Sequence, residues 1–123
     1  MAESSAAGRR FYRLVRDDPA VRDDFVPQGQ VPGYRPPRRA SPNLMRAIMH
    51  GVSVFDTELA ARDQNVIFAK RRSGSPFRFI GGLDIPDDSP VVCDDEFGND
   101  HHWDLYATAD ELLRYVTPPL IPL

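Results

Sequence analysis

The sequence has 123 residues, of which 41% are hydrophobic, and a formal net charge of −3. That length and composition suit one folded domain and exclude a wholly disordered chain. The single cysteine, Cys93, excludes an internal disulfide and a multi-cysteine zinc site. No apolar run reaches the roughly 18 residues of a membrane-spanning helix, and the first ten residues lack the apolar stretch of a secretory signal. We therefore expect a soluble, cytoplasmic protein that binds no membrane.

The charges are divided unevenly along the chain. Residues 1–80 carry fourteen Lys and Arg against eight Asp and Glu, whereas residues 81–123 carry one Arg against ten acids. Arginine suits bidentate contact with phosphate or carboxylate, so the first part is a candidate anion-binding surface. The alternative is that the excess of arginine over lysine reflects only nucleotide base composition, and that the basic and acidic surfaces neutralise each other after folding. The acidic part is a candidate docking face for a basic protein, and a pI near 5.5 argues against nucleic acid.

Residue alternation, helix caps and turn residues predict a series of short elements after a disordered tail at residues 1–10. In chain order they are a strand over 11–16, a helical turn over 19–25, a proline-rich loop over 27–42, a helix over 42–49, a strand over 52–56, a helix over 58–71, a strand over 77–85 with a bulge at Gly81-Gly82, strands over 91–93 and 102–106, a helix opening at 108–111, a strand at 115–116, and a proline-rich tail over 118–123. They predict one mixed α+β domain over residues 11–117, with about five strands and two or three short helices.

The sequence has none of the strong catalytic motifs: no GxxxxGK[ST], GxGxxG, HExxH or GxSxG occurs. His101 and His102 stand beside Asp100 and Asp104, but adjacent strand residues point to opposite faces, so we predict no metal site there. Cys93 is flanked by a valine and an aspartate in the run VVCD, and we expect it to be a small buried hydrophobe rather than a nucleophile.

An ordered set of three polar residues is the more informative pattern. Arg13 lies in the middle of the first predicted strand, Ser53 lies between apolar neighbours in the second, and Thr57 lies at the following strand-to-helix turn. A cation and a hydroxyl on adjacent strands, beside a helix N-terminus, would form a pocket for a pyrophosphate. The alternative is that Ser53 satisfies a backbone group while Arg13 faces solvent or pairs with a carboxylate (Asp17, Asp84 or Asp104).

The segments that carry these residues resemble a known family. FYRLV at 11–15, and GVSVFDT at 51–57 leading into ELAA at 58–61, are similar to the small bacterial ADP-ribosyltransferase-like toxins. These include the RES-domain toxins of toxin–antitoxin pairs and related interbacterial effectors. A group of small uncharacterised bacterial proteins has the same order of segments, ending in a strand and helix like 102–113. The resemblance covers residues 11–117 and implies a curved, split, mixed β-sheet with NAD in its cleft.

The resemblance also implies roles for individual residues. A first-strand arginine holds the nicotinamide ribose or a phosphate, which corresponds to Arg13, and a second-strand hydroxyl supports the cleft, which corresponds to Ser53. Tyr12 and Phe55 are the candidates to stack on nicotinamide. Thr57, at the helix start, completes this part of the expected NAD-binding set.

The family also needs a late glutamate to stabilise the cation-like transition state, and this sequence has no Glu-x-Glu. Glu96 is the better candidate because Glu111 is expected to act as a helix cap, and His102 is a possible substitute hydrogen-bonding group. We therefore expect a NAD-using toxin whose acidic residues 81–123 dock an antitoxin or immunity protein. The alternative is a non-catalytic protein of the same fold that binds a partner, for instance through residues 27–42.

Overall fold

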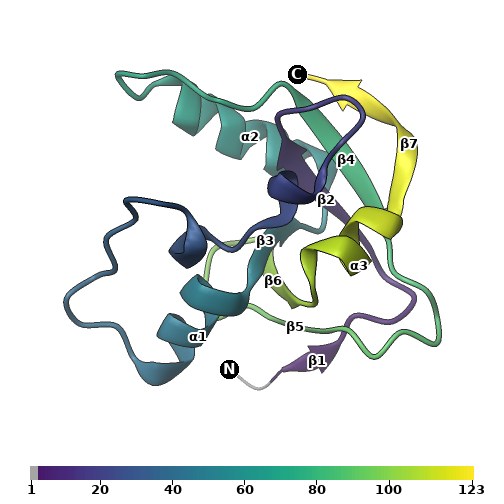
Figure 1. Cartoon of the computed structure of the whole chain (residues 1–123), viewed down its shortest axis with the longest axis horizontal. Coiled ribbons are helices and arrows are strands. Elements are labelled where there is room, and N and C mark those ends of the chain that lie inside the picture. Colours follow the sequence, from purple (N-terminus) through teal and green to yellow (C-terminus); the bar gives the residue numbers. More distant parts are fainter. Residues whose placement is uncertain (1–2) are drawn as a thin grey trace.

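The chain folds around a seven-stranded sheet in a computed structural model that describes residues 3–123 (Figure 1). The strands lie in the order β1-β5-β6-β3-β2-β4-β7. Their bounds are β1 (Ser4–Ser5), β2 (Arg10–Val15), β3 (Val52–Phe55), β4 (Phe79–Asp84), β5 (Val92–Asp94), β6 (His102–Tyr106) and β7 (Val116–Pro122). The helices are the 3-10 helices η1 (Arg22–Phe25) and η2 (Gln28–Gln30) and the α-helices α1 (Pro42–His50), α2 (Glu58–Ala69) and α3 (Ala109–Arg114).

The expected α+β class is confirmed, but the expected mixture of strand directions is wrong. All six pairings among the described strands are antiparallel. A parallel pair needs a crossover that returns the chain to the same end of the sheet, and no neighbouring strands here are connected in that way.

None of the described helices is long and apolar enough to span a membrane.

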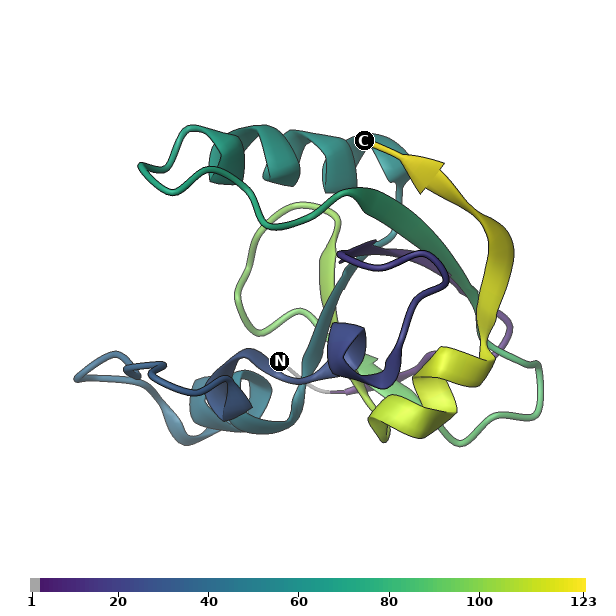
Figure 2. The same cartoon turned by 45° about the horizontal axis from the view of Figure 1, so that its top comes forward.

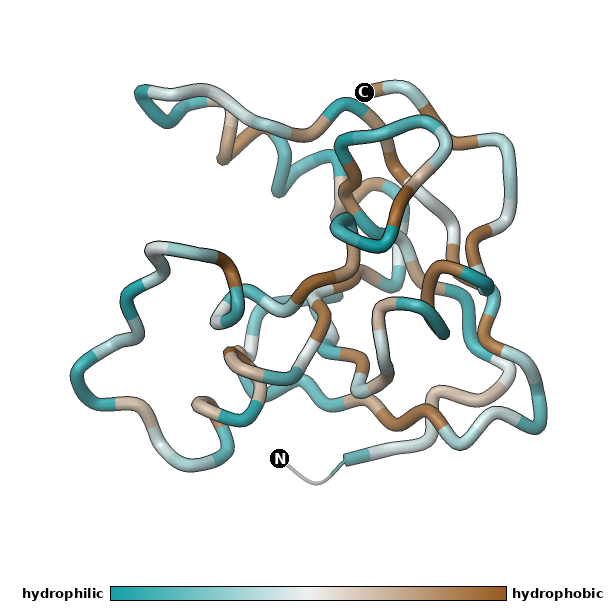
Figure 3. The backbone as a smooth tube through the Cα atoms, viewed as in Figure 1, coloured by the Kyte–Doolittle hydropathy of each residue, from teal (hydrophilic) through white to brown (hydrophobic). Residues whose placement is uncertain are grey.

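Side chains alternate between two apolar layers, one on each face of the sheet. The larger layer combines strand residues with side chains from η1 and α3: Phe11, Val15, Phe25, Val52, Val54, Leu83, Cys93, Leu105 and Leu112. The smaller layer combines Leu14, Phe55 and Ile80 with Ala61 of α2. Figure 2 shows α2 on one side of the strands and η1 and α3 on the other, and Figure 3 shows hydrophobic segments gathered where the strands cross. Burial of these layers is the main stabilising contribution to the fold.

The sheet is narrow at its centre. Strand β2 pairs with β4 over six residue pairs, from Arg10↔Asp84 to Val15↔Phe79, but is in register with β3 at one pair only, Tyr12↔Phe55. The two halves of the sheet are therefore joined by a short junction between β2 and β3. Arg13, the residue after Tyr12, lies at that junction.

The N-terminal segment is ordered where a tail was expected. Ser4 and Ser5 pair with Cys93 and Val92 of β5, and Ala6 is fully buried in the larger apolar layer. Small residues with no period give no sign of a strand, and this one is created by its pairing with a distant segment.

The C-terminal residues also form a strand where a tail was expected. Strand β7 contains Pro118, Pro119 and Pro122 and pairs with β4, with a shift of register between Ile80 and Gly82 that matches the expected bulge. Proline lacks only the N–H donor, and β7 is the last strand in the order, so one of its sides has no ladder to break.

The predicted starts of α1, α2 and α3 are confirmed, whereas the helical turn expected from residue 19 begins only at Arg22. Each N-cap hydroxyl accepts a hydrogen bond from a backbone N–H three residues on: Ser41 from Leu44, Thr57 from Ala60 and Thr108 from Glu111. The Glu111 carboxylate, expected to reach back to the cap, accepts instead from the Tyr115 hydroxyl at 2.8 Å.

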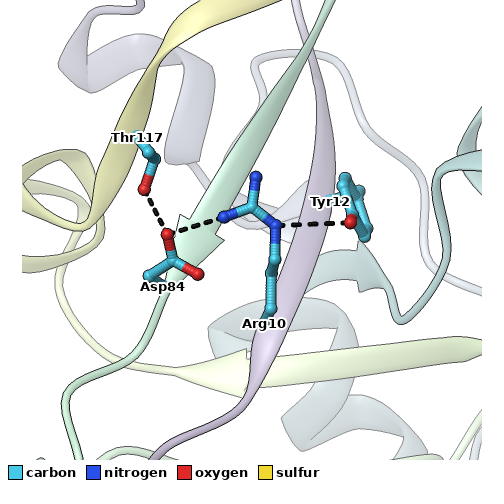
Figure 4. A network of polar contacts seen from close by, with 4 residues as sticks. All are labelled: Arg10, Tyr12, Asp84 and Thr117. Atoms are coloured by element: carbon cyan, nitrogen blue, oxygen red, sulfur yellow. Dashed lines mark hydrogen bonds and ion pairs between the residues drawn. The ribbon is translucent and has the colours of Figure 1, made fainter.

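A polar network ties β2, β4 and β7 together on the outside of the sheet (Figure 4). Arg10 donates to Asp84 at 2.6 Å and to the Tyr12 hydroxyl at 3.3 Å, and Thr117 donates to the same Asp84 oxygen. The Thr117 hydroxyl and the Arg10 guanidinium lower the pKa of Asp84. The guanidinium passes over Gly82, where a side chain would collide with it.

Candidate functional site

The Arg13 side chain points inward and bridges the junction between β2 and β3. Its Nε donates to the backbone carbonyl of Asp24 at 2.9 Å, and its Nη1 donates to the carbonyl of Ser53 at 2.6 Å. Nη2 makes no hydrogen bond to any residue that the structure describes. Burial lowers the pKa of Arg13 to about 10, against the opposing effect of Asp24 and Asp104, so the group stays charged.

Ser53 lies opposite Asp104 in the β3–β6 pairing, and its hydroxyl donates to Oδ1 of Asp104 at 3.4 Å. The Asp104 side chain is fully buried, and its Oδ2 has no hydrogen-bond partner. Burial, with the charge of Asp94, raises the pKa of Asp104 to about 7, although Ser53 and Arg13 act in the other direction. This carboxyl group is therefore partly protonated near neutral pH.

A second carboxylate lies directly across from the first. Asp94 pairs with Asp104 between β5 and β6 and accepts a hydrogen bond from the Tyr106 hydroxyl at 2.7 Å. Its other oxygen, Oδ1, is buried without a partner. Burial and the neighbouring Asp94 raise the pKa of Tyr106 well above its usual range, so Tyr106 remains a donor.

His102 completes this polar cluster, which comprises Ser53, Asp94, His102, Asp104 and Tyr106 on one face of β3, β5 and β6. Its ring is edge-on to Phe55 and Phe97, with ring centroids 5.6 and 5.3 Å away. Burial lowers the pKa of His102, and Arg13 adds to that effect, so the ring is neutral. Its Nδ1 is buried without a partner, as are one oxygen each of Asp94 and Asp104.

Three buried polar atoms of one cluster have no protein partner within residues 3–123, whereas such atoms are almost always hydrogen-bonded to protein or to ordered water in folded proteins. Buried polar groups without hydrogen bonds are energetically unfavourable, and they occur at sites where a ligand or a reacting group supplies the missing hydrogen bonds. A carboxyl group that titrates near neutrality can donate or accept a proton and can stabilise a developing positive charge. Within residues 3–123, no three His, Cys, Asp or Glu side chains are arranged to hold a metal ion.

The structure brings only some of the expected site residues together. The Arg13 guanidinium meets the carbonyl of Ser53, not its hydroxyl, because Arg13 shares the face of Phe11 and Val15 whereas Ser53 shares the face of Phe55. The expected hollow shared by that guanidinium and that hydroxyl is therefore not formed.

The remaining expected residues lie around the cluster. Tyr12 is the register partner of Phe55, and Phe55 contacts His102. Thr57 caps α2 and, with Phe55, lines a hollow beside that helix. Glu96 lies in the turn after β5, while the carboxylate bonded to Ser53 is that of Asp104.

Sequence reasoning considered Asp104 only as a partner for Arg13 or for a metal. The available signal was a charged residue within an alternating strand, between Trp103 and Leu105, where an inward carboxylate needs a polar partner.

Comparisons of the chain with known protein families, with curated proteins and with solved structures find no match.

Proposed function

We propose that this protein is an ADP-ribosyltransferase-like enzyme that uses NAD, either hydrolysing it or transferring ADP-ribose to a macromolecule. The observation that carries the proposal is the Ser53–Asp104 pair at the junction of the two halves of the sheet, where Arg13 reaches the Ser53 carbonyl from the opposite face. A hydroxyl-supported carboxylate next to an inward arginine is the set of groups that the resemblance to these toxins implies. The short β2–β3 junction also fits the split sheet of that resemblance.

In this proposal Asp104 takes the role first expected of Glu96. Cleavage of the bond between ribose and nicotinamide develops positive charge on the ribose, and a nearby carboxylate lowers the energy of that charge. Asp104 is held by Ser53, and its second oxygen has no partner among the described residues. Because the side chain is fully buried, the proposal requires the cluster to open before a ligand can reach that oxygen. Arg13 would contribute positive charge, and one hydrogen bond from Nη2, toward a phosphate or ribose oxygen.

The test is release of nicotinamide from NAD by the purified protein, measured by chromatography. Asp104→Asn keeps the size of the side chain but removes the negative charge, and we expect a loss of roughly a hundredfold or more in rate. Asp88→Asn is the matched control, because Asp88 is exposed. Circular dichroism establishes that both variants are folded. Absence of nicotinamide release by the wild-type protein would refute the enzymatic proposal.

A second candidate function is a non-catalytic protein that binds a partner. It is favoured by the complete burial of Asp104 and by the two backbone carbonyls that already engage Arg13. On this reading the polar cluster is structural, and the acidic residues 81–123 dock a basic partner. Calorimetric titration separates the two functions, because a non-catalytic protein gives no heat with NAD and gives salt-dependent binding to its partner.

A further inference from the structure

His101 and Asp56 form an oriented pair outside the polar cluster. Nδ1 of His101 lies 2.7 Å from Oδ1 of Asp56, and the indole N–H of Trp103 donates to the other Asp56 oxygen at 3.1 Å. The carboxylate is therefore fixed from two sides. The imidazole remains 56% exposed, with Nε2 the ring nitrogen that the carboxylate does not engage. A carboxylate bonded to Nδ1 fixes the tautomer in which Nε2 is a proton acceptor.

The backbone at His101 is held in an uncommon conformation. Its φ is +63°, and it is the one non-glycine residue with positive φ within residues 3–123. The backbone N–H of Asp56 donates to the His101 carbonyl at 2.9 Å, which locks the end of β3 to the start of β6. Such backbone outliers cost free energy and gather at functional sites. Here the conformation presents the imidazole at the edge of the sheet.

The imidazole borders a hollow of about 590 Å³ between α2 and residues 99–101. Its apolar lining includes Phe55, Leu59 and Ile67, and the last two are 68% and 54% exposed. Two carboxylates, Asp63 and Asp100, lie at the same hollow. An uncharged, partly apolar ligand fits this lining, whereas an anion would be repelled by the two acids.

We propose that His101 is a general base for the hydrolysis of uncharged esters bound in this hollow, with Asp56 as its positioning residue. Nε2 of His101 takes a proton from water while the water oxygen bonds to the acyl carbon. The bond from that carbon to the alcohol oxygen then breaks, and the departing oxygen receives the proton from Nε2. The products are a carboxylic acid and an alcohol.

This inference does not depend on NAD as a ligand, because it rests on residues other than Arg13, Ser53 and Asp104. The ester hydrolysed in the test contains no nucleotide. Failure of NAD turnover would leave it standing, and its own failure would leave the NAD proposal standing.

The experiment measures hydrolysis of p-nitrophenyl butyrate by the full chain. His101→Asn removes the base but retains a residue that tolerates positive φ, so the fold should persist. After the rate of hydrolysis in buffer alone is subtracted, we expect the kcat/KM of His101→Asn to be roughly a hundredfold lower than that of the wild-type protein. His50→Asn, at an exposed histidine at the end of α1, should leave the rate unchanged. A wild-type rate equal to that of His101→Asn overturns the proposal.

Two further measurements separate a catalytic role from a structural one. Asp56→Asn should lower kcat more than it raises KM and should shift the pH profile, because the asparagine no longer fixes the imidazole tautomer. The anionic ester p-nitrophenyl succinate should be a poorer substrate than the butyrate ester. A pH profile that does not change with Asp56→Asn, or faster hydrolysis of the anionic ester, overturns the assigned roles.

Discussion

Asp94 and Asp104 are register partners across β5 and β6, and their side chains are only 5% and 0% exposed. Two like charges opposite each other in a sheet repel, and burial increases that repulsion. Burial of the Asp104 carboxyl, reinforced by the charge of Asp94, raises the pKa of Asp104 to about 7, while Asp94 accepts the hydrogen bond from Tyr106.

The buried pair makes stability depend on pH. The pKa of Asp104 is about 7 in the folded protein and about 3.9 in an unfolded chain, so the protonated group stabilises the fold below pH 4 and that contribution disappears as pH rises to 7. Asp104→Asn stays neutral throughout. Relative to wild type, we expect its free energy of unfolding to increase between pH 4 and pH 8 by on the order of 3–4 kcal/mol. Urea denaturation at both pH values measures the change.

The control for this prediction is Asp88→Asn, at an exposed carboxylate, which should follow the wild-type pH dependence within about 0.5 kcal/mol. If Asp104→Asn and the wild-type protein show the same pH dependence, Asp104 is ionised in the folded protein, and the inference that its pKa is raised is wrong.

The features that the sequence predicted are local ones. The caps Ser41 and Thr108, and Asp56 or Thr57 as the cap between them, could be predicted because a cap depends on a polar side chain and on the three residues after it. Strand β1 was missed, and β7 was predicted only at its start (residues 115–116), because both depend on pairing with distant segments, β5 and β4. No local pattern distinguishes an edge strand that contains prolines from an irregular tail.

The candidate site was predictable to the same extent. Ser53 was identified as a hydroxyl on the strand expected beside that of Arg13 and through the family resemblance, but its carboxylate partner follows from the β3–β6 register. Our proposal gives Asp104 the role that the sequence analysis gave to Glu96, because Asp104 is the carboxylate bonded to Ser53. The placement of Arg13 and Ser53 on opposite faces follows from the Tyr12↔Phe55 register, because alternation within each strand does not by itself relate the faces of two strands.

The Thr57 hydroxyl stabilises the start of α2 by accepting from the backbone N–H of Ala60 at 3.1 Å. Thr57→Ala should lower the free energy of unfolding by about 1 kcal/mol, whereas Thr57→Ser, which retains the hydroxyl, should lower it by less. Chemical denaturation of the two variants provides the comparison. An equal loss in both would show that the methyl group matters and that the cap does not.

Cys93 should react slowly with thiol reagents in the native protein. Its side chain is fully buried, and this burial raises the pKa of the thiol, although Arg9 at 3.4 Å has the opposite effect. Because the thiolate is the reactive form, labelling by a chromogenic disulfide should be slow in buffer and rapid in denaturing urea. Equal rates in the two conditions would mean that Cys93 is accessible without unfolding.

Arg13 should be the cation on which stability depends most. Replacing it with methionine retains most of the side-chain volume but leaves the carbonyls of Asp24 and Ser53 without their donors, at a cost of about 2–4 kcal/mol in the free energy of unfolding. Arg16→Met is the matched control, since that side chain is exposed and only its backbone N–H contacts Asp24. Equilibrium urea unfolding of both variants measures the difference. If Arg13→Met is as stable as Arg16→Met, the guanidinium does not hold the β2–β3 junction together.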